Sequence, residues 1–106
     1  MSTVAATAKP YIGRFAPSPS GPLHMGSLLS AVASYLDAKA NNGKWLLRIE
    51  DIDPPREIKG SSKAIIASLE AHDLYWDDDI LWQHEQYDYY RDCLTELTKK
   101  HLIYPC

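Results

Sequence analysis

The sequence has little of what marks several large protein classes. Its 106 residues include only two cysteines, Cys93 and Cys106, too few for a disulfide-stapled scaffold, so we expect a reduced, cytoplasmic setting. The N-terminus lacks the basic cluster and apolar core of a secretory signal peptide. No apolar run approaches the length of a membrane span, so we expect no membrane partner.

Basic charge is also scarce. Eleven Lys and Arg face fourteen Asp and Glu, for a net charge of -3, which excludes a polybasic arm but not a local basic patch for a nucleic acid. No repeat or low-complexity segment is visible. The 45% hydrophobic content is that of a soluble globular domain. We expect a flexible tail over residues 1–9 and one folded unit, or part of one, over residues 10–106.

The first fifty residues predict a strand, a tight loop, a helix and a second strand. A short apolar run predicts the first strand at Tyr11–Ala16, and three prolines and a glycine then exclude helix and central strand from Pro17 to Pro22. A helix is expected from Leu23 or His24 to Ala40, before the stop signal Asn41-Asn42-Gly43. Its expected inward face is Met25, Leu28, Leu29, Val32 and Leu36.

The second strand is expected at Lys44–Asp51, where a nearly continuous apolar run predicts cover on both faces. A strand, helix and strand in this order form a βαβ unit. The fold class is therefore α/β, with parallel strands and a right-handed crossover.

The remaining residues predict two more helices. Ser61 or Ser62 is expected to cap a helix that ends near His72, with Ile65, Ile66 and Leu69 inward. The acidic run Asp77–Asp79 is expected to be a solvated loop before a short strand at Leu81–Gln83. A last helix is expected from Gln86 to His101, and its expected buried side is Tyr87, Tyr90, Leu94, Leu97 and His101.

The junction of the proline-rich loop with the first helix is the strongest candidate for a site. A helix N-terminus offers free backbone N–H groups and partial positive charge, which suit a phosphate. Gly21 and Gly26 remove side chains where a nucleotide would approach the backbone. His24 and Ser27 place polar groups on the first turn. Taken alone, His24 is better explained as a capping or surface histidine.

Two longer motifs change this balance. The stretch Arg14 to Ser27, RFAPSPSGPLHMGS, resembles the first signature of class I glutamyl-tRNA synthetases, which runs into the family's HIGH motif, with HMGS in place of HIGH. Arg48 to Asp53, RIEDID, resembles the same family's RIEDTD. Ser27, the run from Asp51 to Glu57 and the sequence LWQ at residues 81–83 are most similar to the glutamyl-Q tRNA(Asp) synthetases, shortened members without an anticodon-binding domain.

The resemblance implies the N-terminal half of a Rossmann-like class I catalytic domain. It implies a ligase-type enzyme that activates L-glutamate with ATP and Mg²⁺ and transfers it to queuosine of tRNA(Asp). By matching position, Arg14 would pair with a carboxylate of glutamate, Glu50 would hold its α-amino group, and His24 with Ser27 would act at the α-phosphate. The implied glutamate site is Arg14, Phe15, Ala16, Pro17, Ser18 and Glu50. The implied nucleotide site, the HIGH region, is Pro17, Ser18, Pro19, Ser20, Gly21, Pro22, Leu23, His24, Met25, Gly26 and Ser27.

Plainer alternatives stay open for each position. Arg14 would otherwise be a surface arginine, Ser18 a turn serine and Ser27 a helix cap. Glu50 would otherwise pair with Arg48 or Lys44. At the level of the whole protein, the rivals are an enzyme that charges tRNA(Glu) and a non-catalytic relative that uses the site for binding.

The resemblance also places the first cysteine of a zinc-binding Cys-x-Cys pair at Cys106. A tetrahedral zinc site takes four ligands, so the others would lie beyond this residue. The lysine-rich KMSKS signature of class I enzymes does not occur in the 106 residues. We therefore expect the full-length protein to be monomeric and active, and this chain alone to be inactive and poorly stable, with an exposed sheet edge.

Overall fold

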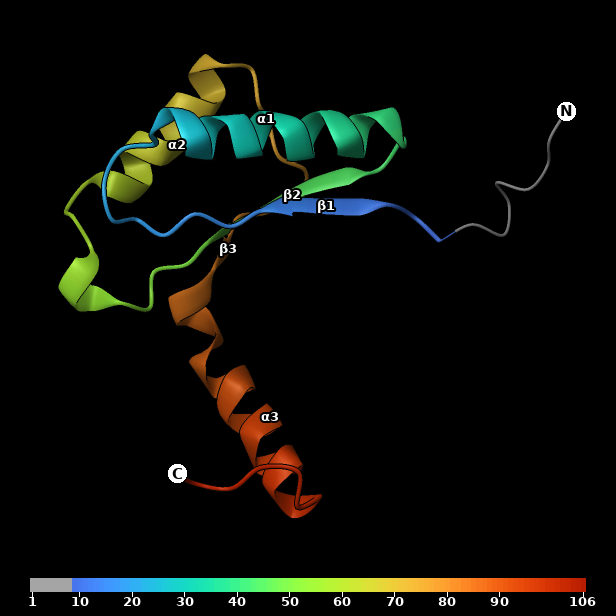
Figure 1. Cartoon of the computed structure of the whole chain (residues 1–106), viewed down its shortest axis with the longest axis vertical. Coiled ribbons are helices and arrows are strands. Elements are labelled where there is room, and N and C mark those ends of the chain that lie inside the picture. The colour runs from blue at the N-terminus through green and yellow to red at the C-terminus, as the bar shows by residue number, and fades with distance from the viewer. Residues whose placement is uncertain (1–8) are drawn as a thin grey trace, which may run out of the picture.

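A computed structural model describes residues 9–106, so the tail predicted for residues 1–9 lies, apart from Lys9, outside the described residues. The described part is a three-stranded sheet with two helices on one side and a third helix that extends away from it (Figure 1). The elements in chain order are β1 (Ile12–Phe15), α1 (Met25–Ala40), β2 (Lys44–Ile49), the 3-10 turn η2 (Pro54–Arg56), α2 (Ser61–Ala71), β3 (Leu81–Trp82), the 3-10 turn η3 (Gln83–Gln86) and α3 (Tyr87–Lys99).

The sheet is parallel throughout, in the order β1-β2-β3. Ile12 pairs with Lys44 and Arg48 with Leu81, so β2 is the central strand. The α/β class, the parallel strands and the boundaries of all six elements predicted from the sequence are confirmed to within a few residues. No helix among residues 9–106 is long and apolar enough to cross a membrane.

The core lies between the sheet and the two helices above it. Trp45, Leu47 and Ile49 of β2 are essentially fully buried and meet Ile65 and Leu69 of α2. Full burial of each such side chain stabilises the fold by about 1.5–3 kcal/mol. The indole N–H of Trp45 is also satisfied, because it donates to Ser34 Oγ at 3.0 Å.

The packed face of α1 differs from the expected one. Ala31 and Ala38 are its buried residues, whereas Met25, Leu29 and Leu36 are exposed, so their predicted inward position is wrong. The reason is a close approach of helix to sheet: a Cβ at Gly13 would lie 3.3 Å from Ala38 Cβ. Small side chains therefore face the strand, and the larger leucines are turned outward.

Three other expectations are also wrong. Exposure alternates along β2, with Leu46 and Arg48 only half-buried, because both covering helices lie on one side. Helix α3 buries no residue, including its expected inward side, because it extends away from the sheet. Gly60, in a left-handed conformation, is the N-cap of α2 in place of Ser61 or Ser62.

The acidic run is not simply solvated. Asp77 Oδ2 accepts hydrogen bonds from the Trp45 backbone N–H at 2.9 Å and from Lys39 Nζ at 3.2 Å, and Asp78 pairs with Lys44. The Trp45 N–H first, then Lys39, lower the pKa of the Asp77 carboxyl below its ordinary value of 3.8. Asp77 thus fastens the loop to the beginning of β2.

Candidate functional site

The proline-rich loop, residues 17–22, is held in place along its length. The Pro17 carbonyl accepts from the Glu50 backbone N–H at 2.9 Å, just beyond β2. The Pro19 carbonyl accepts from the Ile58 N–H at 3.0 Å, ahead of α2. The loop is thus tied to the segment that follows the central strand, at the carboxyl edge where parallel sheets bind their ligands.

Gly21 provides the third attachment. Its N–H donates to Ser61 Oγ at 3.0 Å, and the same hydroxyl donates back to the Gly21 carbonyl at 2.7 Å. Ser61 is only 4% exposed. Gly21 has φ +148°, which L side chains rarely adopt, and a Cβ there would have ample room. Its glycine is therefore required by the backbone conformation, and its predicted role beside a nucleotide stays a prediction.

His24 is the N-cap of α1. Its Nδ1 accepts the Ser27 backbone N–H at 3.2 Å, and its Nε2 lies 3.0 Å from Ser27 Oγ. Because Nδ1 accepts, a neutral ring carries its proton on Nε2, and that proton points to Ser27 Oγ. The Ser27 hydroxyl hydrogen is then left for another acceptor. The capping alternative for His24 is realised, whereas Ser27 is not the cap.

Gly26 makes room for this arrangement. A Cβ at this position would lie 3.1 Å from His24 Cε1 and 3.2 Å from His24 Nδ1, closer than ordinary van der Waals contact. The glycine therefore keeps space for the imidazole, in addition to the predicted role of leaving the helix N-terminus open.

A cavity of about 490 Å³ lies over this loop and the beginning of α1, and we call it the loop cavity. It contains most of the residues that the sequence assigned to the nucleotide. Its lining is Phe15, Ala16, Pro17, Ser18, Ser20, Gly21, Pro22, Leu23, His24, Ser27, Ser30 and Ile65.

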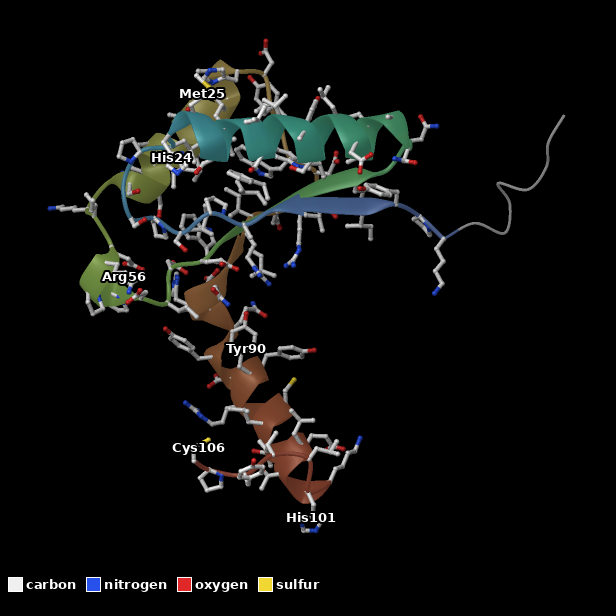
Figure 2. All side chains as sticks on the ribbon, viewed as in Figure 1. His24, Met25, Arg56, Tyr90, His101 and Cys106 are labelled. Atoms are coloured by element: carbon white, nitrogen blue, oxygen red, sulfur yellow. The ribbon has the colours of Figure 1, made fainter. Side chains whose placement is uncertain are left out.

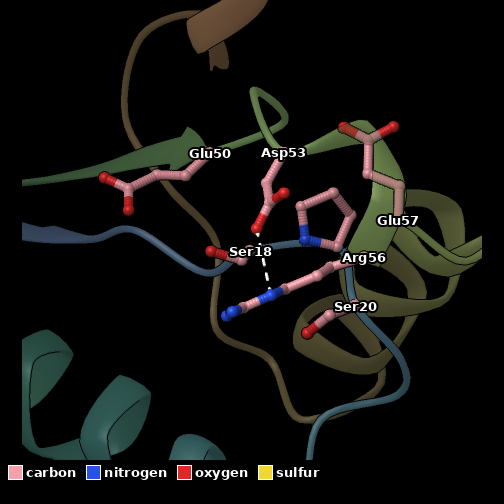
Figure 3. A pocket seen from close by; sticks show the side chains of 7 residues that line it. Ser18, Ser20, Glu50, Asp53, Arg56 and Glu57 are labelled. Atoms are coloured by element: carbon pink, nitrogen blue, oxygen red, sulfur yellow. Dashed lines mark ion pairs between the residues drawn. The ribbon is translucent and has the colours of Figure 1, made fainter.

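A second cavity of about 190 Å³, the acidic cavity, adjoins the first, because Ser18 and Ser20 line both. Three carboxylates and one guanidinium surround it (Figure 3). Its lining is Ser18, Pro19, Ser20, Glu50, Asp53, Arg56 and Glu57. Asp53 and Arg56 form an exposed ion pair at 3.4 Å. The two cavities together form a bipartite site, one part at a helix N-terminus and one part acidic.

Glu50 is paired in this structure. Its Oε2 accepts from Arg48 Nη2 at 2.5 Å, and both side chains are about 30% exposed. The ion-pair alternative is thus realised, while the carboxylate still lines the acidic cavity. Arg48 Nε is buried and has no hydrogen-bond partner within residues 9–106. A buried donor left unpaired costs about 1–3 kcal/mol, so this guanidinium calls for an explanation.

Two predicted site residues, Arg14 and Met25, line neither cavity, and a third, Phe15, lines the loop cavity but packs mainly in the core. Arg14 is exposed and lines neither cavity, because the alternation of β1 turns it to the sheet face opposite Phe15 and α1. The ring of Phe15 stacks on Trp45 at 6.3 Å and belongs to the core. Met25 is 78% exposed and points away from the loop (Figure 2).

Cys106 lies near the far end of α3, away from both cavities (Figure 2). It is an exposed free thiol. Across residues 9–106, no three His, Cys, Asp or Glu side chains are grouped to hold a metal ion. The described residues alone therefore do not fit a zinc site, for which Cys106 would supply one of four ligands.

Several site residues were not predicted. Asp53, Arg56 and Glu57 belong to a run that served only to identify the subfamily, and Ser61 was expected to cap a helix. The sequence signal that could have found Asp53, Arg56 and Glu57 is the pair of prolines at positions 54 and 55, which turn the chain sharply after β2. Nothing local signals Ser61, which lies 40 residues from its partner.

A family model described as "tRNA synthetases class I (E and Q), catalytic domain" matches residues 12–106. Glutamyl-Q tRNA(Asp) synthetase of Escherichia coli K12 is 56% identical over 96 residues, which are 91% of this chain and 31% of that protein. The enzyme of the same name from Cronobacter sakazakii is 53% identical over 100 residues, 94% of this chain and 34% of that protein.

Solved structures agree. A glutamate tRNA ligase from Elizabethkingia meningosepticum, crystallised in complex with its amino acid, superposes with a TM-score of 0.82 at 36% identity, over 86% of this chain and 20% of that one. The chain thus spans about a third of the length of the curated relatives it matches. It belongs to the class I tRNA synthetases of the E and Q kind, and residues 12–106 match their catalytic domain.

Proposed function

We propose that this chain forms the ATP- and glutamate-binding part of an enzyme that activates L-glutamate as glutamyl-adenylate and transfers it to queuosine of tRNA(Asp). The observation that carries the proposal is the bipartite site. A cavity at a helix N-terminus, suited to phosphate, adjoins an acidic cavity suited to an ammonium group, and the two share Ser18 and Ser20.

The loop cavity would take the nucleotide. The glutamate carboxylate is itself the nucleophile in adenylate formation, so no protein base is required; the protein positions the reactants and stabilises charge on the α-phosphate. His24 orients the Ser27 hydroxyl at 3.0 Å, which leaves the Ser27 hydrogen free to donate to a phosphate oxygen. The open backbone N–H groups of the first turn of α1 add to this anion site. Mg²⁺ would enter with ATP as part of the substrate.

The acidic cavity would take the amino acid. Glu50 is its most enclosed carboxylate and would accept the α-ammonium group, while Ala16 and Ser18 border the cavities on the loop side. Arg14 would bind a glutamate carboxylate by a two-pronged hydrogen bond. Arg14 lies outside both cavities, so this role requires glutamate to reach the open face of the sheet at the end of β1.

The activation step is tested by glutamate-dependent ATP–pyrophosphate exchange with the full-length protein. We expect exchange in the wild type and a loss of roughly 10²-fold in His24→Ala, the scale of one lost transition-state donor. Lys63→Ala, on the outer side of α2, is the matched control. Exchange in His24→Ala within threefold of wild type would remove His24 from the mechanism.

The acceptor needs a separate test. The identity to glutamyl-Q tRNA(Asp) synthetases, 53–56%, favours queuosine, whereas the superposition on a glutamate tRNA ligase favours tRNA(Glu) as the second candidate. We expect labelled glutamate to be transferred to tRNA(Asp) that carries queuosine and not to the same tRNA without it. Charging of tRNA(Glu) at its 3' end would establish the second candidate. Binding of glutamate with neither pyrophosphate exchange nor transfer would instead support the third candidate, a non-catalytic relative that uses the site for binding alone.

Zinc is proposed only for the full-length protein, with Cys106 as one ligand. The test is metal analysis of the purified full-length protein and of Cys106→Ser. One zinc per chain in the wild type and loss of zinc in the variant are expected, and equal zinc in both would exclude Cys106.

A further inference from the structure

We propose that Arg48 is a positioning residue for the amino-acid site: it fixes the Glu50 carboxylate so that one oxygen faces the substrate ammonium. The proposal rests on the function proposed above. It gives the Arg48–Glu50 ion pair at the end of β2 a role in orienting the carboxylate, beyond compensating its charge.

The guanidinium of Arg48 is enclosed at its Nε and reaches Glu50 with its Nη2. Arg48 lies on the central strand and pairs in register with Leu81 of β3. Its Nε is buried, so only the far end of the side chain reaches the site. A guanidinium is planar, so the atoms packed around the buried Nε restrict the rotation about Cδ–Nε that would swing Nη2 away from Glu50. The 2.5 Å contact from Nη2 to Glu50 Oε2 therefore sets the orientation of the carboxylate in addition to compensating its charge.

The other carboxylate oxygen is the one that would bind substrate. Arg48 occupies Oε2, while Oε1 makes no hydrogen bond within the described part of the chain. A carboxylate has about four acceptor positions on its two oxygens, so Oε1 can receive an ammonium hydrogen while Oε2 stays bound to Arg48. Glu50 lines the acidic cavity, which places that oxygen where the amino acid would enter.

The surrounding charges make such an anchor necessary. Asp53 and Glu57 line the same cavity as Glu50, and Arg56 is paired with Asp53 at 3.4 Å. Without Arg48, the Glu50 carboxylate would face two other carboxylates and would rotate away from them. Lys44, the next cation on this face of β2, is already paired with Asp78 at 3.1 Å.

The test is made on the full-length protein by titration with two ligands. L-glutamate carries the ammonium group, and glutarate has both carboxylates but no amine. We expect Arg48→Met to weaken L-glutamate binding about tenfold, as for loss of a charge-assisted contact, and to change glutarate binding less than twofold. Arg48→Lys, which keeps the charge but loses the planar fork, should fall between. Lys44→Met, the matched control, should bind both ligands as the wild type does.

A double-mutant cycle separates positioning from general damage. If Arg48 acts through Glu50, adding Arg48→Met to Glu50→Gln should weaken glutamate binding less than twofold further, because the two residues act as a unit. Exchange kinetics should show the effect in KM for glutamate, with kcat changed less than about threefold. Additive losses in the cycle, or parallel weakening of glutarate and glutamate, would overturn the proposal. If Arg48→Met does not fold, Arg48→Lys carries the same comparison.

The titrations need no turnover, so the two proposals fail separately. A wild-type protein that binds glutamate but does not exchange pyrophosphate would overturn the proposed activity, and the role of Arg48 would still be decided by binding. A wild-type protein that exchanges normally, with Arg48→Met indistinguishable from Lys44→Met, would overturn the role of Arg48 alone.

Discussion

Gly26→Ala is the substitution that most directly separates the geometry of the candidate site from the stability of the fold. The new methyl group would lie 3.1 Å from His24 Cε1 and 3.2 Å from His24 Nδ1, whereas ordinary contact begins at 3.4 Å. The exposed imidazole must therefore shift by a few tenths of an ångström. Such a shift lengthens the 3.2 Å contact from Ser27 N to Nδ1, which is already at the weak end of the hydrogen-bond range, and misaligns Nε2 with Ser27 Oγ.

The expected result is a loss of activity without a loss of stability. We expect pyrophosphate exchange to fall roughly tenfold, less than in His24→Ala, because the ring is displaced and not removed. Alanine has a higher helix propensity than glycine by up to about 1 kcal/mol, which offsets the weakened cap at His24, so the free energy of unfolding should change little. The assays are exchange kinetics and denaturant unfolding on the same preparation.

The double variant Gly26→Ala/His24→Ala tests the cause. If the methyl group acts through the imidazole, the double variant should be no slower than His24→Ala. Exchange in Gly26→Ala within twofold of wild type would refute the reasoning, as would a further loss in the double variant.

Two further predictions concern the attachments of the loops. Ser61→Ala removes both hydrogen bonds to Gly21 and should lower the free energy of unfolding, measured by denaturant titration, by about 2 kcal/mol. The control Ser62→Ala should change it by less than about 0.5 kcal/mol, and equal effects of the two substitutions would contradict the attachment. The pKa of Asp77 is lowered in the fold, so its contribution is present above pH 3.8 and is lost as the pH falls through the folded-state pKa below that value. Asp77→Asn should therefore flatten the acid limb of the stability profile and cost about 1 kcal/mol at neutral pH, while Asp79→Asn should leave both unchanged.

The arrangement of elements was predictable because its signals are local. The prolines of residues 17–22, the stop at Asn41-Asn42-Gly43 and the apolar run of β2 each act within a few residues, and a βαβ order then leaves a parallel sheet as the favoured outcome. The faces of α1 were not predictable in this way. Leu28 and Leu29 are adjacent in sequence and both fit the apolar pattern of the helix, yet Leu28 packs against the core and Leu29 is exposed. The choice between them depends on the close approach of Ala38 to Gly13, which is a contact between distant residues.

In the candidate site too, residues positioned by local sequence were predicted and those positioned by distant contacts were missed. His24, Ser27 and the loop residues lie together in one cavity, as their sequence neighbourhood predicted, and Glu50 lies beside them because parallel strands end at one edge. The acidic cavity was missed because it depends on the turn after β2, which brings Asp53, Arg56 and Glu57 back to the loop. The orientation of Glu50 by Arg48 was seen only as an alternative to function, since a sequence does not show which carboxylate oxygen remains free.

The central claim is that the loop cavity and the acidic cavity bind ATP and glutamate together for adenylate formation. Its most direct test is ATP–pyrophosphate exchange by the full-length protein, with L-glutamate compared against L-glutamine and L-aspartate. We predict exchange that depends on L-glutamate and is reduced by at least about tenfold in Glu50→Gln, which keeps the shape of the side chain but removes its charge. Exchange that is equally supported by the other amino acids, or that is unchanged in Glu50→Gln, would contradict this assignment of the two cavities.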